Sequence, residues 1–334
     1  MNVSVIIVNF NGMEFLPACL DGLQAQTRAV DEVIVVDNGS TDGSPECVCD
    51  FYPYVRLIAT GENLGFAAGN NRGIRASSGD CLILLNNDTV PGPSFIESVL
   101  EPLERADPVS AVAGVLVFST NPDRVATAGI EIFDNGLALD ARTGEVWRDL
   151  PAEFSVFGPS GGAMAVRRSA LDDIELFPEP YFLYLEDVDL AWRLRLREHE
   201  TVARSDAWAL HVYSGSSGHE SPLKDYYLAR NRIWTLIRCW PGSFWRRFWW
   251  NVLLYELGAL GFGVVRFRPE IVRGRLAGWA GYARLRQTRK QIQQSVTSAP
   301  AQLLYWVCPA PAARVHLGLR RTIARLSRAN GRND

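Results

Sequence analysis

Residues 32–42 read EVIVVDNGSTD, an apolar run that changes abruptly into a polar, glycine-containing segment. The run predicts a buried strand, Glu32–Asp37, which presents the carboxylate of Asp37 at its carboxyl end. Gly39 makes the following loop flexible, and the hydroxyl residues after it can cap a helix. A carboxylate in this position can accept a hydrogen bond from the imide N–H of a uracil or thymine ring, although a plain turn with a helix cap would use the same residues.

The flanking segments repeat this alternation of short apolar runs and helical patterns as far as about residue 118. The pattern is typical of βαβ units and predicts an α/β fold with a mostly parallel sheet and flanking helices. The expected strands are Val3–Val8, Glu32–Asp37, Val55–Ala59, Cys81–Asn86 and Ala111–Phe118. The expected helices are Met13–Gln26, Pro45–Phe51, Gly69–Ala76 and Ser94–Arg105. Because such connections are right-handed, the loops after the strands gather at one carboxyl edge, where we expect the functional site.

The chain after residue 118 is less regular. Residues 119–160 are rich in turn formers and predict an irregular excursion or hairpin over the site, with a short β segment at Ile130–Phe133. Residues 161–240 return to mixed structure after a Gly161-Gly162 turn. The elements expected there are a strand at Ala163–Val166, a helix from about Val188 to Arg197, a strand at Ala207–Leu210 and a helix from Leu223 to Trp240.

A second polar segment follows the strand Cys81–Asn86, where the chain continues Asn87-Asp88-Thr89. Mg²⁺ and Mn²⁺ prefer oxygen ligands and bridge diphosphate oxygens, so a carboxylate at a strand end is a suitable anchor for them. Asn-Asp sequences also form simple turns. Further along, His211 could be a neutral metal ligand and Arg230 a bidentate phosphate contact, although each residue could equally be packed or solvated.

A third segment of interest, YFLYLEDVDL, is acidic; it spans residues 181–190 and places Glu186 and Asp187 at the expected start of a helix. The helix dipole lowers carboxylate pKa values there, whereas burial or a close acidic neighbour raises them. Such a pair suits a general base that takes the proton of a sugar hydroxyl. Two acids at a helix N-terminus also serve as simple capping residues.

The order of these segments resembles that of family 2 glycosyltransferases of the GT-A fold, and in particular of bacterial rhamnosyltransferase-like enzymes of cell-wall and O-antigen assembly. The resemblance covers about residues 1–240 and rests on eight features in register. They are SVIIVNFNG, VIVVDNGSTDGS, ENLGFAAGNNRG, LLNNDT, the Gly161–Arg168 turn and strand, FLYLEDVDL, a histidine 24 positions after Asp187, and YYLARN.

The resemblance implies a role for each candidate residue. Asp187 is expected to be the catalytic base, with Glu186 beside it, and Asp88 and His211 would hold a divalent cation, Mg²⁺ or Mn²⁺. The residues expected along the nucleotide-sugar donor are Asn9, Asp37, Asn63, Gly65, Asn70, Arg72, Asn87 and Arg230. The sequence departs from the family's Asp-x-Asp motif at its first acid, which is Asn86 here, so the donor phosphates would supply more of the metal ligands.

By the same resemblance we expect an inverting transfer from a TDP- or UDP-sugar, with TDP-rhamnose as the specific candidate, to a glycan or polyprenyl-linked acceptor. Residues 1–240 would form the GT-A domain, with a nucleotide-sugar half at 1–118 and an acceptor and catalytic half at 119–240. The alternative is a degenerate sugar-nucleotide-binding scaffold of a membrane complex, for which Asn86 is the one supporting feature. A sugar nucleotidyltransferase or a dinucleotide oxidoreductase would need a glycine-rich loop after the first strand, where the chain has Asn9-Phe10-Asn11-Gly12.

The C-terminal part, residues 241–334, is predicted to be a basic, Trp-rich helical extension. From residue 238 onward the chain has 17 Lys and Arg against three acids, within an overall charge of -3. The Trp and Phe content favours an anionic membrane surface over nucleic acid. The apolar segment Phe244–Val265 is interrupted by Glu256, which favours an interfacial or re-entrant helix, with a buried core helix as the alternative. Six cysteines without metal or CxxC spacing indicate a reduced setting, so we expect a cytoplasmic protein, peripheral on the inner face of the cell membrane.

Overall fold

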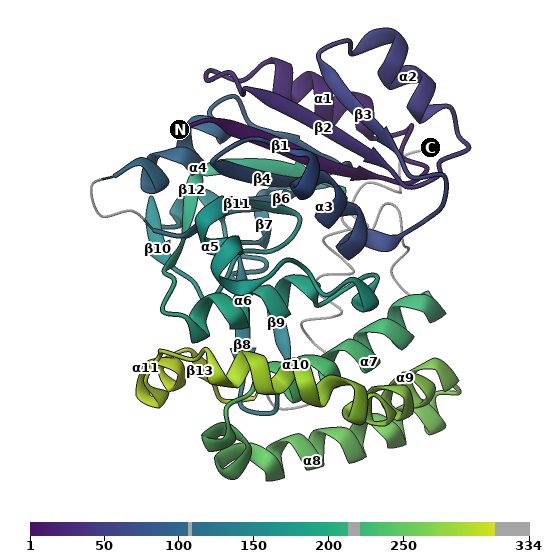
Figure 1. Ribbon diagram of the computed structural model, residues 1–334, viewed down its shortest axis with the longest axis vertical. Helices are drawn as coiled ribbons and strands as arrows, with labels where there is room; N and C mark the ends of the chain where they lie inside the picture. The colour runs from purple at the N-terminus through teal and green to yellow at the C-terminus, as the bar shows by residue number, and fades with distance from the viewer. Residues whose placement is uncertain (106–108, 213–220, 311–334) are drawn as a thin grey trace.

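The computed structural model describes residues 1–105, 109–212 and 221–310. A twisted sheet with helices on both faces forms the upper body in Figure 1, and the helices that follow residue 221 form a separate layer below it. This is the predicted α/β architecture. The strands are β1 (Val3–Asn9), β2 (Glu32–Asp37), β3 (Val55–Ala59), β4 (Cys81–Asn86), β5 (Thr89–Pro91), β6 (Ala111–Phe118), β7 (Asn121–Thr127), β8 (Ile130–Phe133), β9 (Ala138–Asp140), β10 (Glu153–Ser155), β11 (Ala163–Arg167), β12 (Thr201–His211) and β13 (Val307–Cys308).

The main sheet has the strand order β10-β12-β6-β11-β4-β1-β2-β3. Strands β1 to β4 are parallel to one another, and β11 runs antiparallel between β4 and β6. Since β11 is antiparallel to both neighbours, β6 runs in the same direction as β4, and β12 is parallel to β6. The carboxyl ends of β1, β2, β4, β6 and β12 therefore share one edge. The register pairs Asn9 with Asp37 and Val8 with Asn86, so the polar residues that end these strands are neighbours.

The helices before residue 200 pack on the two faces of this sheet. They are α1 (Leu16–Gln24), α2 (Ser44–Phe51), α3 (Gly65–Ala76), α4 (Phe95–Glu104), α5 (Arg168–Ile174) and α6 (Glu186–Leu196), with short 3-10 turns at Trp147–Asp149 and Glu179–Tyr181. Helix α7 (Pro222–Cys239) packs on α6 and on the helices that follow it in the chain. In β1, Val5 and Ile7 pack into the core that includes α1 and α4, whereas Ile6 packs into the core that includes α3 and α6. Burial of both faces explains why the strands are continuous apolar runs.

The excursion between β6 and β11 adds a small second sheet. Strands β8 and β9 form a hairpin, and β13, from the far end of the described chain, pairs in parallel with β8. Val307 lies opposite Ile132 and Cys308 opposite Phe133. The pairing of β13 with β8 therefore fixes the end of the C-terminal helical layer to the excursion.

The C-terminal layer consists of α8 (Gly242–Val265), α9 (Pro269–Ala280), α10 (Tyr282–Gln294) and α11 (Pro300–Tyr305). Helix α8 is long and apolar enough to cross a membrane by length and composition. Its large side chains Trp249, Trp250, Leu254 and Leu257 are more than half exposed, which excludes the buried core helix. Glu256, the residue that interrupts the apolar segment, is buried, as is Val252 one turn before it.

Several elements differ from the expected ones. Helix α3 begins at Gly65, four residues before its predicted start, and β12 extends back to Thr201 through an irregularity between Arg204 and Trp208. Strand β5 and helix α5 were not expected at all. Both are short, so their hydrophobic period covers too few residues to distinguish them from a loop.

Candidate active site

A chain of buried hydrogen bonds crosses the ends of three parallel strands. Asn87 Nδ2 donates to Asn9 Oδ1 at 2.8 Å, and Asn9 Nδ2 donates to Asp37 Oδ1 at 3.1 Å. The second carboxylate oxygen of Asp37 accepts from the amides of Gly39 and Ser40, at 3.1 and 3.0 Å. Oδ2 of Asp37 therefore stabilises the turn that the sequence suggested as an alternative, while Oδ1 is bound to Asn9. A nucleobase contact by this residue stays a prediction.

Asp88 and His211 meet at the same edge, although 123 positions separate them in the sequence. Strand β5 pairs antiparallel with the end of β12 and places His211 opposite Thr89. His211 Nε2 lies 3.2 Å from Asp88 Oδ1, and both residues are buried. A carboxylate oxygen and an imidazole nitrogen this close fit a divalent cation. No cluster of three or more His, Cys, Asp or Glu side chains occurs in the described part of the chain, so diphosphate oxygens and water would have to complete the ligand set.

Glu186 and Asp187 begin α6, as the third acidic segment predicted. Asp187 Oδ2 accepts from the amide of Gly161 at 2.9 Å and Oδ1 from that of Val188 at 2.8 Å. Burial raises the pKa of Asp187 despite these hydrogen bonds, and burial together with the Asp187 charge raises that of Glu186 far above its usual range. A buried carboxylate with a raised pKa binds a proton more readily, which is what a general base needs.

The loop that delivers these acids has an unusual backbone. Phe182, Tyr184 and Leu185 all have positive φ, at 65°, 70° and 65°, a region that bulky residues rarely adopt. Asn231 on α7 opposes this strain, because its fully buried side-chain amide donates to the carbonyls of Tyr181, Leu183 and Tyr184 at 3.0, 2.9 and 2.7 Å. Asn231 was not predicted to have a role, although its position in YYLARN was an available signal.

Gly65 allows this loop to approach the first turn of α3. The amide of Phe66 donates to the carbonyl of Phe182 at 2.7 Å. A Cβ on Gly65 would lie 2.5 Å from both the ring and the carbonyl oxygen of Phe182, and the residue has a φ of +81°. Asn63 Oδ1 accepts from the Gly65 amide at 2.9 Å and stabilises the turn. The two residues therefore shape the contact between the first turn of α3 and the acid-bearing loop.

Three predicted donor residues lie apart from the cluster of acids. Arg230 donates to the carbonyls of Pro180 and Tyr181 at 2.8 and 3.0 Å and stacks on Trp234, and burial lowers its pKa. Asn70 is buried and donates within its own helix, and Arg72 is exposed. In this structure Arg230 supports the same loop as Asn231, and a phosphate contact by Arg230 stays a prediction.

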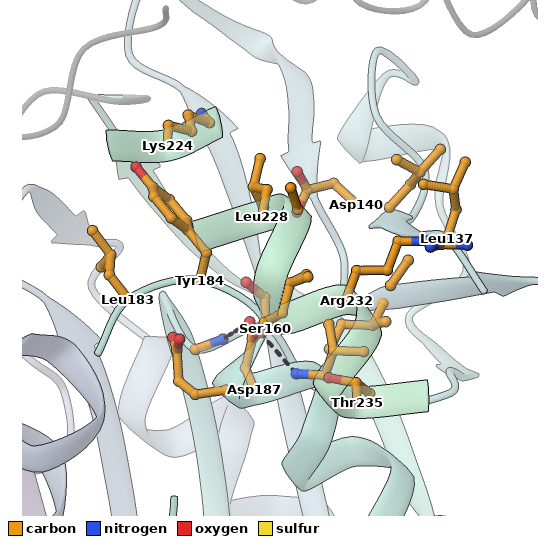
Figure 2. Close-up of a pocket in the computed structure, with 18 of the residues that line it drawn as sticks. Leu137, Asp140, Ser160, Leu183, Tyr184, Asp187, Lys224, Leu228, Arg232 and Thr235 are labelled. Carbon is orange, nitrogen blue, oxygen red and sulfur yellow. Dashed lines mark hydrogen bonds between the residues drawn. The ribbon is translucent and has the colours of Figure 1, made fainter. Parts of the chain in front are cut away.

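A cavity of about 1080 Å³ lies between the sheet edge, α6, α7 and the C-terminal helices. Figure 2 shows Asp187 and Asp140 on its wall, with Tyr184, Lys224 and Arg232 around it. The candidate residues that line the cavity are Asn63, Gly65, Asn87, Asp88, Glu186, Asp187 and His211. The candidates that do not line it are Asn9, Asp37, Asn70, Arg72 and Arg230.

Comparison with known proteins defines the class of this site. The chain belongs to glycosyl transferase family 2, whose family model matches residues 4–175, and the resemblance seen in the sequence is thereby confirmed. The protein is therefore a glycosyltransferase.

One relative is the N-acetylglucosaminyl-diphospho-decaprenol L-rhamnosyltransferase of Mycobacterium tuberculosis, which is 31% identical over 241 residues, or 65% of this chain and 78% of the relative. Two solved structures show the same fold. GalNAc-T7 with UDP, GalNAc and Mn²⁺ aligns with a TM-score of 0.62 at 12% identity, over 89% of this chain and 58% of the other. The mannosyltransferase PcManGT of Pyrobaculum calidifontis with GDP-Man and Mn²⁺ aligns with a TM-score of 0.55 at 18% identity, over 98% and 84%.

Proposed function

We propose that the protein is an inverting, metal-dependent glycosyltransferase of cell-surface polysaccharide assembly. Its donor is a TDP- or UDP-sugar, specifically TDP-rhamnose, and its acceptor is a hydroxyl group of a glycan or lipid-linked saccharide. The observation that carries the proposal is the cavity that Asp187 shares with the Asp88–His211 pair. The relative from M. tuberculosis, named for a decaprenol-linked acceptor and a rhamnosyl donor group, supports the choice of sugar and acceptor.

The residues support a single displacement. Asp187 accepts the proton of the acceptor hydroxyl, whose oxygen then forms a bond to the anomeric carbon while the bond from that carbon to the diphosphate oxygen breaks. The Gly161 amide, 2.9 Å from Asp187 Oδ2, holds the carboxylate in one orientation while the proton is transferred. Asp88 and His211 would hold the cation, which when bound neutralises charge on the departing diphosphate.

The two halves of the chain divide these tasks in the proposal. Residues 1–118 hold the donor, with Asn63, Gly65 and Asn87 at the cavity and the Asn9–Asp37 network behind them. Residues 119–240 supply the base and the acceptor side. Residues 241–334 attach the protein to the inner face of the cell membrane from the cytoplasm, an arrangement that the exposed apolar side of α8 supports.

The test is release of nucleoside diphosphate from a panel of nucleotide sugars, with and without Mn²⁺, in the presence of a lipid-linked acceptor extract. We expect metal-dependent release from TDP-rhamnose, its loss in Asp88→Ala, and nearly complete loss in Asp187→Asn with donor binding retained, because general-base help contributes about 10²–10⁴-fold to the rate. Asp50→Asn, at an exposed acid on α2, is the matched control and should behave as wild type. Donor binding without turnover under all conditions would contradict the enzyme and favour the scaffold.

A further inference from the structure

The cavity continues beyond the acids into the C-terminal layer. Its far wall is formed by apolar residues of three helices, namely Leu228, Leu254, Gly258, Ala259, Phe262 and Ile271. Leu254 is 51% exposed and lines the cavity as well, so this end reaches the protein surface on the apolar side of α8. The space therefore links the base to a surface suited to a hydrocarbon chain.

Three charged side chains are buried at this end. Glu256 of α8 pairs with Arg232 of α7, and Arg275 Nε of α9 lies 3.4 Å from the second oxygen of Glu256. The exposed fractions are 4% for Arg232, 6% for Glu256 and 5% for Arg275, and both arginines line the cavity. Two guanidinium groups thus face one carboxylate away from water, which leaves one positive charge in excess.

The hydrogen bonds of this cluster are also incomplete. Arg232 donates to Glu256 and to the carbonyl of Asn135, but its Nε and the Nε of Arg275 have no hydrogen-bond partner among the residues that the structure describes. Burial lowers the pKa of Arg232, as expected for a cation removed from water. Arg268 at the same end is paired with Asp225 at 2.8 Å. A buried, partly satisfied excess of positive charge is costly unless an anion offsets it.

We propose that this end of the cavity binds the diphosphate and the first isoprenoid units of a lipid-linked acceptor, with the phosphates at Arg232 and Arg275 and the chain along Leu254, Gly258 and Phe262. The inference rests on the proposed function and deepens it. In such an acceptor the sugar is joined directly to the diphosphate. The base and the anion site must therefore share one cavity, as Asp187 and the two arginines do.

The first test measures binding of farnesyl diphosphate to the full-length protein by calorimetry, with farnesol and inorganic pyrophosphate as separate probes. Farnesyl diphosphate should bind more tightly than either probe, because each satisfies only half of the site. Arg275→Gln should weaken binding about 10- to 100-fold, the usual effect of a hydrogen bond to a charged group. Arg273→Gln, on the same helix with its side chain 71% exposed, should leave binding unchanged. Glu256→Gln should strengthen binding, because it removes the competing carboxylate.

The second test blocks the chain path without touching a charge. A Cβ on Gly258 or on Gly261 would meet no atom within 4 Å, but only Gly258 lines the cavity. Gly258→Leu should therefore weaken farnesyl diphosphate binding at least tenfold, whereas Gly261→Leu should not, and neither should lower helix stability.

Hydrolysis of the nucleotide sugar, measured on the same variants, separates the two proposals. Unchanged hydrolysis with equal farnesyl diphosphate affinity in Arg275→Gln, Gly258→Leu and wild type would overturn the acceptor site and leave the transferase intact. Tight binding of pyrophosphate alone would assign the arginines to a free phosphate and would likewise overturn it.

Discussion

Replacing Asn231 with leucine tests whether the strained loop before α6 sets the position of Asp187, the proposed catalytic base. The two hydrogens of the Asn231 side-chain amide are shared among three carbonyls. The carbonyl of Tyr181 also accepts hydrogen bonds from Arg230 and from the Leu183 amide, so it would keep partners in the variant. The carbonyls of Leu183 and Tyr184 would lose their partner, and we expect a loss of about 2–4 kcal/mol of unfolding free energy from two buried unsatisfied groups. Relaxation of the loop would displace Asp187, and a misplacement of about 1 Å costs about 10²-fold in kcat.

The assay combines urea unfolding with steady-state transfer kinetics. Asn71→Leu is the matched control, since Asn71 is equally buried and its side-chain amide pairs with the backbone of Phe177 at 2.8 and 3.0 Å. Both variants should lose stability, but only Asn231→Leu should lose kcat in excess, with little change in the donor KM. Equal kcat values in the two variants would refute the idea that Asn231 positions the base.

Three further predictions follow from the site and the C-terminal layer. Because burial raises the pKa of Asp187, its active, ionised form is lost as the pH falls through that raised pKa, so kcat should begin to fall at a pH above the usual carboxylate range. The Asp140 charge also raises this pKa, so Asp140→Asn should move the fall in kcat to lower pH in a pH–rate profile, and an unmoved profile would contradict the role of Asp187 as the base. Chelation by EDTA should abolish transfer and Mn²⁺ restore it, with about 10- to 100-fold more Mn²⁺ needed for half-maximal activity in Asp88→Ala; activity that survives EDTA would exclude a metal requirement. Serine at Trp249 and Trp250, which are 53% and 52% exposed, should reduce sedimentation with anionic vesicles without lowering Tm, and undiminished sedimentation would show that this face does not bind the membrane.

The sequence was most informative where both faces of a strand are buried. The runs that end in Asn9, Asp37 and Asn86 are nearly uninterrupted in apolar residues, so their polar ends were visible, and the rule that parallel carboxyl ends share one edge brought them together correctly. Glu186 and Asp187 could also be predicted from the sequence, because acidic residues are favoured in the first turn of a helix, where the helix dipole is positive.

The remaining features depend on contacts between residues distant in the chain. Asn231 reaches carbonyls 47 to 50 positions away, and nothing in its neighbourhood shows which way its amide turns. Glu256 appeared to interrupt an apolar helix, whereas its partners Arg232 and Arg275 lie on two other helices. The early start of α3 at Gly65 depends on the hydrogen bond from the Phe66 amide to the Phe182 carbonyl, a contact that the local sequence pattern does not predict.

The reversed direction of β11 has an electrostatic consequence. The acids Asp88, Glu186 and Asp187 share the cavity at the edge where the parallel strands end, and their charges disfavour one another. Strand β11 begins at that edge because it runs against its neighbours, so the turn before it lies there as well, and the Gly161 amide of this turn donates to Asp187. A single inversion of chain direction thus places an amide donor beside these acids, and its hydrogen bond favours the ionised form of Asp187 against the larger effect of burial.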